Sequence, residues 1–97
     1  MRGYKKTMIA KTAIPQRNDK ITEKFLDDEI ILYNKTTHTI HNLNQTAAIL
    51  WTLCDGKMTI IQMIEMLLEK YKGSKKAIEQ DVLKTLEEMK ENNLITL

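Results

Sequence analysis

His38 and His41 are the two histidines of the chain, and their types and spacing are those of a possible metal pair. The residues around them are rich in Thr and Ile, which favours an extended segment. On a strand, side chains three positions apart point to opposite faces of the sheet, so the two imidazoles could not share one ion. The sequence therefore predicts no metal site.

Groups that could perform catalysis are equally sparse. Cys54 is the single cysteine and falls on the apolar face of a predicted helix, where it is expected to fill the core. A nucleophilic thiol would need a base and an orienting acid, and no local signature supplies them. Three scattered glycines cannot form a phosphate-binding loop. The chain is not expected to be an enzyme or to hold a cofactor.

Length and composition describe one small globular domain. The chain has 97 residues, of which 42% are hydrophobic and 29% are charged. These values are typical of a folded chain with room for one modest core. No apolar run approaches the roughly 20 residues that cross a bilayer, and no secretory signal pattern is present. One unpaired cysteine agrees with a reducing compartment, so a cytoplasmic location is expected.

Charge is distributed unevenly along the chain. Residues 1–24 contain seven Lys or Arg against two acids, whereas residues 25–97 contain eight against eleven. Residues 1–14 are predicted to be a flexible basic arm, followed by a domain over residues 15–97. Such an arm is either a contact for an acidic partner or a solvated end.

Three short segments rich in Ile, Thr, Tyr and Phe predict strands over residues 21–26, 29–34 and 38–43. Their connections are too short for a crossover, so neighbouring strands must be antiparallel. The expected sheet has the three strands in sequence order. The third strand then forms an open edge.

The hydrophobic period changes to that of helices after Asn44. A first helix is expected from the Asn44 cap to Asp55-Gly56, and a second after the capping box of Thr59 and Gln62. Gly73-Ser74 separates the second helix from a third, which ends at Asn92-Asn93. The third helix is expected to bury the stripe Ile78, Val82, Leu86 and Met89. Three helices thus follow three strands, which defines an α+β fold.

The segment from Leu43 to Gly56 resembles the family of pyrroloquinoline quinone biosynthesis protein D, PqqD. Its Leu-Asn, Thr-Ala and Asp-Gly pairs, in this order and spacing, carry the resemblance. Further residues fall where the family tends to have them: Pro15, Thr59, Tyr71, Asp81-Val82 and Leu94-Ile95. The resemblance covers roughly residues 15–97. Asp27-Asp28 and Lys35-Thr36-Thr37 depart from the family's turns, which affects loops only.

The resemblance implies a winged-helix-like domain that recognises ribosomally made, post-translationally modified peptides. Members of the family bind the leader of a precursor peptide and present it to a modifying enzyme, often a radical S-adenosylmethionine enzyme, without catalysing the reaction. The leader is expected as an added strand on the third strand, with apolar side chains in a groove facing the third helix. The predicted peptide-binding residues of the strand are His38, Thr39, Ile40, His41, Asn42 and Leu43.

The residues of the third strand favour the same mechanism without the resemblance. The segment from His38 to Leu43 has no Lys, Pro or acid, which are the usual devices that protect an edge from pairing. On the third helix, the positions displaced by one from the buried stripe are predicted to border the peptide: Leu83, Glu87 and Lys90. Three alternative covers of the edge stay open: a second copy, the basic arm, or Ile95-Thr96-Leu97.

Two other function classes fit parts of the pattern. A winged helix-turn-helix that binds DNA would also have capped helices joined by a Gly-containing turn. The third helix, however, carries four lysines and five acids between Ser74 and Asn93, where a phosphate backbone would demand positive charge. The other class is a structural subunit that docks on a larger enzyme whether or not peptide is present.

Overall fold

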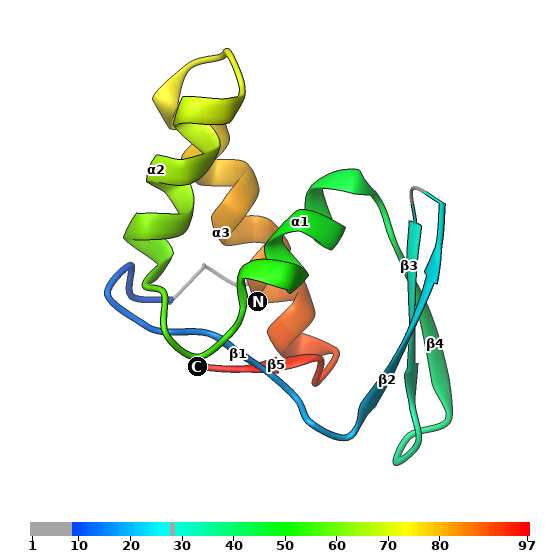
Figure 1. Cartoon of the computed structure of the whole chain (residues 1–97). Coiled ribbons are helices and arrows are strands. Elements are labelled where there is room, and N and C mark those ends of the chain that lie inside the picture. The colour runs from blue at the N-terminus through cyan, green and yellow to red at the C-terminus, as the bar shows by residue number, and fades with distance from the viewer. Residues whose placement is uncertain (1–8, 28) are drawn as a thin grey trace, which may run out of the picture.

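The computed structural model describes residues 9–27 and 29–97 and confirms a sheet followed by three helices. The antiparallel sheet contains β2 (Ile21–Leu26), β3 (Glu29–Asn34) and β4 (Thr39–Leu43) in that order. The helices are α1 (Gln45–Leu53), α2 (Ile60–Lys70) and α3 (Lys75–Glu91). Helix α1 contacts β3, β4 and α3, and Figure 1 shows it between the sheet and the other two helices.

The central strand β3 determines which face of the sheet is buried. Ile30, Leu32 and Asn34 are buried, whereas the residues between them are half-buried, as expected for a sheet with one face on the core. The buried Asn34 is satisfied locally, because its Oδ1 accepts from the Thr36 and Thr37 amides at 2.9 and 3.3 Å. Asn34 thereby shapes the turn that leads into β4.

Strand β4 begins one residue later than predicted. His38 has a φ of 59° and lies in the turn rather than in the strand. A left-handed conformation interrupts an extended run, and the β-branched residues around His38 gave no sign of it. His38 and His41 therefore belong to different structural elements.

Helices α1 and α2 begin at the caps that the sequence predicted, Asn44 and Thr59, and α3 begins at Ser74 in the predicted break. The side chains of Asn44, Thr59 and Ser74 accept from the backbone amide three positions later. Gln62 completes the capping box of α2 by accepting from the Thr59 amide. The caps fix where α1 starts relative to β4.

The core lies between the sheet and the helices. Trp51 is buried, Cys54 is buried as predicted, and the stripe of α3 is buried at Val82, Leu86 and Met89. Ile78 is only half-buried and packs at the edge of the core. The other buried hydrophobic residues are Ile30, Leu32, Leu43, Ala47, Leu50, Ile60, Met63, Ile64, Leu67, Leu94 and Ile95.

A second, two-stranded sheet was not predicted. β1 (Gln16–Arg17) pairs antiparallel with β5 (Ile95–Thr96), and Figure 1 shows this pair at the lower end of the helices. The C-terminal residues therefore bind β1 and do not cover β4.

Only part of the predicted basic arm falls within the described residues, because residues 1–8 lie outside them. In the remainder, the carbonyls of Lys11 and Ala13 accept from the amides of Ile61 and Ile60 at the start of α2. Lys11 also forms an ion pair of 2.9 Å with Glu79 on α3. Among the described helices, none has the length and apolar character required to cross a membrane.

Candidate functional site

The register of the sheet assigns the direction of every backbone group on β3. In a hairpin with a two-residue connection, the pair that flanks the connection is a hydrogen-bonded pair, and here that pair is Leu26 and Glu29. Hydrogen-bonding direction alternates along an antiparallel strand. Glu29 therefore points toward β2, while Ile30, Leu32 and Asn34 point their amides and carbonyls toward β4.

The same alternation identifies the free backbone groups of β4. The register partners of the β3 residues that face β4 are Leu43, His41 and Thr39. The Asn34 carbonyl accepts from the His38 amide at 2.8 Å, which agrees with this direction. Ile40 and Asn42 consequently point their amides and carbonyls away from β3. In the described part of the chain, no strand lies beyond them.

The side chains of β4 alternate in the same way. His41 and Leu43 pair with the buried residues Leu32 and Ile30, so they lie on the core side of the sheet. Ile40 lies on the outer face and is 66% exposed. A peptide paired with β4 would extend the sheet, so its side chains would lie alternately on the core side and on the outer face.

The opposite edge of the sheet differs from β4 in its charge. β2 carries Glu23 and Lys24, and the Glu23 carboxylate accepts from the Trp51 indole at 2.5 Å. Charged side chains on an edge strand oppose pairing with another chain. β4 has no charged residue. Of the two edges, β4 is the one suited to pairing.

A hollow of about 190 Å³ lies between β4, the start of α1 and α3, and it forms a groove beside β4. We call this hollow the groove. An extended chain on the β4 edge would direct alternate side chains toward this hollow, because strand side chains alternate between two faces. The hollow is lined by His41, Asn42, Leu43, Asn44, Ala47, Thr85, Glu88, Met89, Asn92 and Leu94.

The helix residues predicted to border the peptide do not line this hollow. Leu83, Glu87 and Lys90 occupy one flank of the buried stripe of α3, and the hollow is lined from the other flank. Leu83 is half-buried and packs against the core, and Lys90 is exposed. Glu87 is half-buried, with one carboxylate oxygen that has no hydrogen-bond partner in the described structure. Their predicted contact with peptide stays a prediction.

Sequence reasoning missed three residues on the groove side of α3: Thr85, Glu88 and Asn92. Hydrophobic periodicity identifies the buried stripe of a helix but treats its two flanks alike. The flank that faces β4 depends on how α3 crosses the sheet. The sequence contained no signal for that choice.

Both histidines have partners that are not metals. His38 Nδ1 lies 3.1 Å from the Tyr33 hydroxyl, and His41 Nε2 lies 3.1 Å from the Thr39 hydroxyl. Thr39 also hydrogen-bonds Thr37 at 2.7 Å. The described residues contain no group of three or more potential metal ligands. The hydrogen bonds of His41 and Thr39 hold two side chains of the β4 edge in place.

Cys54 is fully buried, and burial raises the pKa of its thiol from 9.0 to about 12. Arg17 opposes this rise in pKa and Asp55 adds to it. Because the thiolate is the nucleophilic form of cysteine, such a group is unreactive near neutral pH. Its place in the core agrees with the structural role predicted from sequence.

Comparison with known families gives one match, to coenzyme PQQ synthesis protein D, over residues 29–95. The matched segment begins at β3 and ends at β5, so it includes β4, the hollow and all three helices. No curated protein sequence matches the chain.

Two solved structures share the fold. One is described as a lasso peptide synthetase B1 complexed with the leader peptide; it has a TM-score of 0.78 and 19% identity, and the match covers 88% of this chain and 100% of that one. The other is TbiB1 in complex with the TbiA(beta) leader peptide, with a TM-score of 0.76, 19% identity, and coverage of 82% and 93%.

Proposed function

This chain belongs to the family of coenzyme PQQ synthesis protein D, and we propose that it captures the leader of a ribosomally made precursor peptide as a strand added to β4. The observation that carries the proposal is an uncharged open edge beside a hollow. Ile40 and Asn42 offer two amides and two carbonyls, and the hollow accepts side chains from the same extended chain. Strand addition obtains affinity from the backbone and specificity from alternate side chains.

The proposed binding residues run from His38, in the turn before β4, to Leu43 at the end of β4. Ile40 and Asn42 contribute backbone hydrogen bonds, while His41 and Leu43 face the hollow with their side chains. On α3, the geometry favours Thr85, Glu88 and Asn92 as the facing wall. The two structural neighbours are both complexes with leader peptides, which supports the proposal from outside this chain.

The partner that follows from this function is a peptide-modifying enzyme. The described residues of the groove contain no nucleophile activated by a base, and the thiol of Cys54 is buried away from it. In this proposal the chain is a carrier that presents the bound precursor to a separate enzyme. The family resemblance supports a radical S-adenosylmethionine enzyme in this role.

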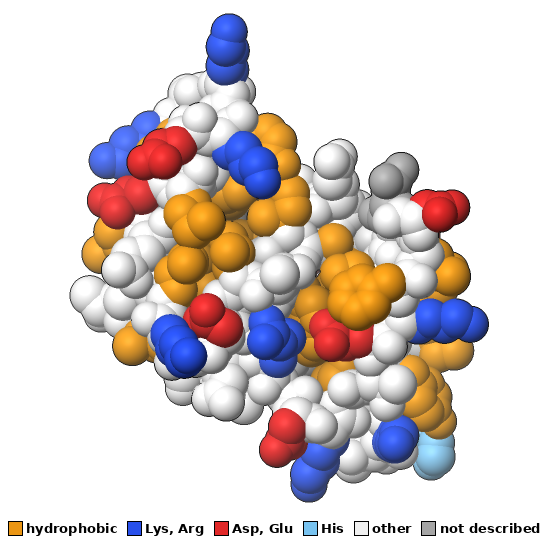
Figure 2. Space-filling model, in the orientation of Figure 1, with side chains coloured by type: hydrophobic (Ala, Val, Ile, Leu, Met, Phe, Trp, Pro, Cys, Tyr) orange, Lys and Arg blue, Asp and Glu red, His pale blue; other side chains and the backbone are white. Residues whose placement is uncertain are grey.

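DNA binding is the less favoured function. On the face in Figure 2, Lys and Arg side chains lie among Asp and Glu side chains rather than in one basic patch. Helix α3, which would enter the major groove, carries Glu88 and Asp81 on the flank that borders the hollows. A phosphate backbone needs the opposite charge.

Proline substitution along β4 tests the proposal. The probe is a peptide selected on the wild-type protein from a displayed library of random 16-residue sequences, with affinity measured by titration calorimetry. Ile40→Pro and Asn42→Pro remove outward amides, so the fold should persist while affinity falls about twofold to tenfold per lost hydrogen bond, or further where the ring clashes. His41→Pro removes an amide bonded to β3 and should lower the melting temperature.

The four strand positions from Thr39 to Asn42 give the internal control, because the amide of His38 is already bonded to the Asn34 carbonyl in the turn before β4. Proline should lower affinity at Ile40 and Asn42, whose amides face the peptide, and lower stability at Thr39 and His41, whose amides face β3. If affinity and stability fall together at all positions, or if affinity never falls, the peptide does not extend this sheet.

A further inference from the structure

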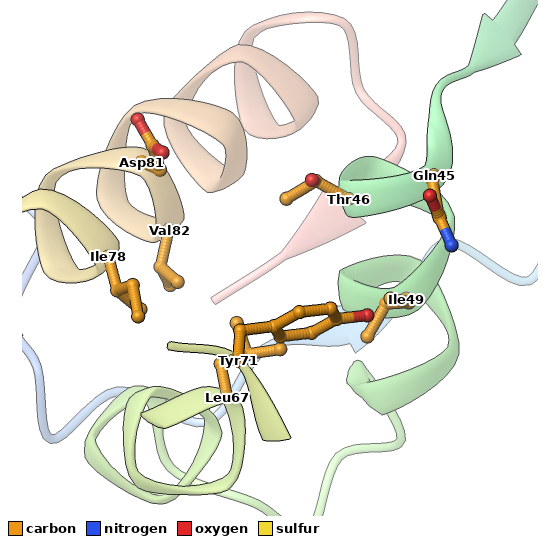
Figure 3. Close-up of a pocket in the computed structure, with 8 residues that line it drawn as sticks. All are labelled: Gln45, Thr46, Ile49, Leu67, Tyr71, Ile78, Asp81 and Val82. Carbon is orange, nitrogen blue, oxygen red and sulfur yellow. The ribbon is translucent and has the colours of Figure 1, made fainter. Parts of the chain in front are cut away.

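A second hollow of about 190 Å³ lies where the three helices approach one another. Figure 3 shows its lining side chains, which come from the start of α1, the end of α2 and the first half of α3. They are Gln45, Thr46, Ile49, Leu67, Tyr71, Ile78, Asp81 and Val82. Most of this lining is apolar. We call this hollow the helix pocket.

The helix pocket continues the groove beside β4. Asp81 of the pocket and Thr85 of the groove are one helical turn apart on the same flank of α3. Asn44 of the groove and Gln45 of the pocket are consecutive residues. A chain that leaves the β4 edge at Asn44 therefore meets the helix pocket next.

The direction of β4 decides which end of the peptide arrives there. β4 runs from Thr39 to Leu43 and continues directly into α1. Antiparallel pairing is the more stable arrangement per residue, and it places the amino-terminal end of the added strand beside Leu43. Residues of the peptide on the amino-terminal side of the paired segment are then adjacent to the pocket.

From this placement we infer that the helix pocket holds one bulky apolar side chain of the same leader, located on the amino-terminal side of its paired segment and next to a basic residue. The inference rests on the proposed function. The pocket is somewhat larger than the roughly 150 Å³ engineered cavity that accepts benzene, so a phenyl ring or a branched aliphatic group fits it. Ile49, Ile78 and Val82 supply apolar contacts.

The charge at the rim of the helix pocket favours a basic residue next to the apolar side chain of the leader. Of the described residues that line the pocket, Asp81 alone is charged, and it is exposed. Glu88 lies two turns further along the same flank of α3. A Lys or Arg beside the apolar side chain is attracted to this rim, whereas an acid in that position is repelled.

Two exposed positions allow the pocket to be tested without disturbing the core. Thr46→Trp places a large side chain into the pocket from α1, and Thr52→Trp puts the same side chain on an exposed position of α1 that does not line it. Asp81→Lys reverses the charge at the rim, and Glu65→Lys is its control on an exposed position of α2.

The probe is again a peptide selected from a displayed library of random 16-residue sequences, together with its version in which the apolar residue before the paired segment is replaced by Ala. That replacement should weaken binding to the wild-type protein about tenfold to a hundredfold, the effect of burying one such side chain. Thr46→Trp should weaken binding of the original peptide similarly and leave the Ala version unchanged. Asp81→Lys should weaken binding about twofold to fivefold only when the neighbouring residue is basic.

The outcomes separate this inference from the proposed function. If Asn42→Pro weakens binding but Thr46→Trp has no more effect than Thr52→Trp, the pocket assignment is wrong and strand addition stands. If selected peptides bind Asn42→Pro as well as wild type, the proposed function itself fails. If the Ala version binds the wild-type protein as tightly as the original peptide, no side chain of the leader fills the pocket, which also overturns the assignment.

Discussion

Neighbouring residues of β4 have different tasks. Ile40 and Asn42 direct backbone groups outward, whereas His41 and Leu43 turn their side chains toward the hollow. This division follows from the period of two of a strand and from the two-residue connection that fixes the register. In the proposed complex, β4 therefore provides both the backbone hydrogen bonds to the peptide and part of the side-chain wall of the hollow.

Glu88 and Lys90 offer a matched test of which flank of α3 meets the peptide. Both are exposed, and only Glu88 lines the hollow. Glu88→Trp should narrow the groove and weaken binding of a selected peptide at least about tenfold, because a bulky side chain occupies the space needed by the ligand. Lys90→Trp should have little effect. Calorimetry with both variants checks this, and a stronger effect at Lys90 would support the flank predicted from sequence.

The raised pKa of the buried Cys54 thiol should cause a loss of stability at alkaline pH. Below pH 9.0 the thiol is protonated in both states, so its contribution is fully present. Above that value the unfolded chain ionises its thiol while the folded chain, with a pKa of about 12, does not. The free energy of unfolding should therefore fall by up to about 1.4 kcal/mol per pH unit from this group. Urea unfolding of wild type and Cys54→Ala at pH 8, 9 and 10 measures the difference in slope; equal slopes would contradict the assignment.

At the scale of elements, the residue that caps α1 also lines the groove beside β4. Asn44 Oδ1 accepts from the Ala47 amide at 2.8 Å, and Asn44 also lines the hollow beside β4. We therefore expect the start of α1 to affect stability and peptide binding together. The cap of α2 at Thr59 is chemically similar but lies outside both hollows.

The two caps predict different phenotypes. Asn44→Ala should lower the free energy of unfolding by about 1 kcal/mol and also weaken peptide binding, because the first turn of α1 borders the groove. Thr59→Ala should cost a similar amount of stability and leave affinity unchanged. Thermal unfolding and calorimetry on both variants check this. Loss of affinity in both variants would mean that binding responds to stability alone.

The elements predicted from sequence are those set by local patterns. Alternation and short connections predicted the three strands, and the caps at Asn44 and Thr59 together with the break at Gly73-Ser74 predicted the helix starts. The pairing of β1 with β5 was missed because it joins two-residue segments about 80 positions apart, which have no periodicity of their own.

The candidate site was predictable in part for the same reason. The uncharged edge of β4 is a local property of the sequence, and the structure places it at an edge. The flank of α3 that faces it is a tertiary property, so Thr85, Glu88 and Asn92 could not be chosen over Leu83, Glu87 and Lys90 from periodicity.

At the scale of the whole molecule, the segment before β2 is bonded to the C-terminal residues, and we call this contact the closure. β5 pairs with β1, and the amide of Asn18 donates to the carbonyl of Leu94 at 2.9 Å. Leu94 and Ile95 are 2% and 3% exposed, so the last residues belong to the core. Because the chain end pairs with β1, it does not cover β4, which stays an open edge of the three-stranded sheet.

Shortening a buried side chain of the closure should destabilise the entire fold. Leu94→Ala should lower the free energy of unfolding by about 2–5 kcal/mol, because it leaves a cavity in a small core. Leu97 is 44% exposed, and Leu97→Ala should cost less than about 1 kcal/mol. Urea denaturation of both variants gives the comparison. A small effect at Leu94 would mean that the C-terminal strand is dispensable.

Strand addition to β4 is tested most directly by amide hydrogen exchange, measured residue by residue by NMR with and without a selected peptide. In the free protein the amides of Thr39, His41 and Leu43 should be protected by β3, and those of Ile40 and Asn42 should exchange rapidly. Saturating peptide should slow exchange at Ile40 and Asn42 by at least about tenfold. Unchanged exchange at these two amides, with new protection at β2 or on the helices alone, would contradict the account.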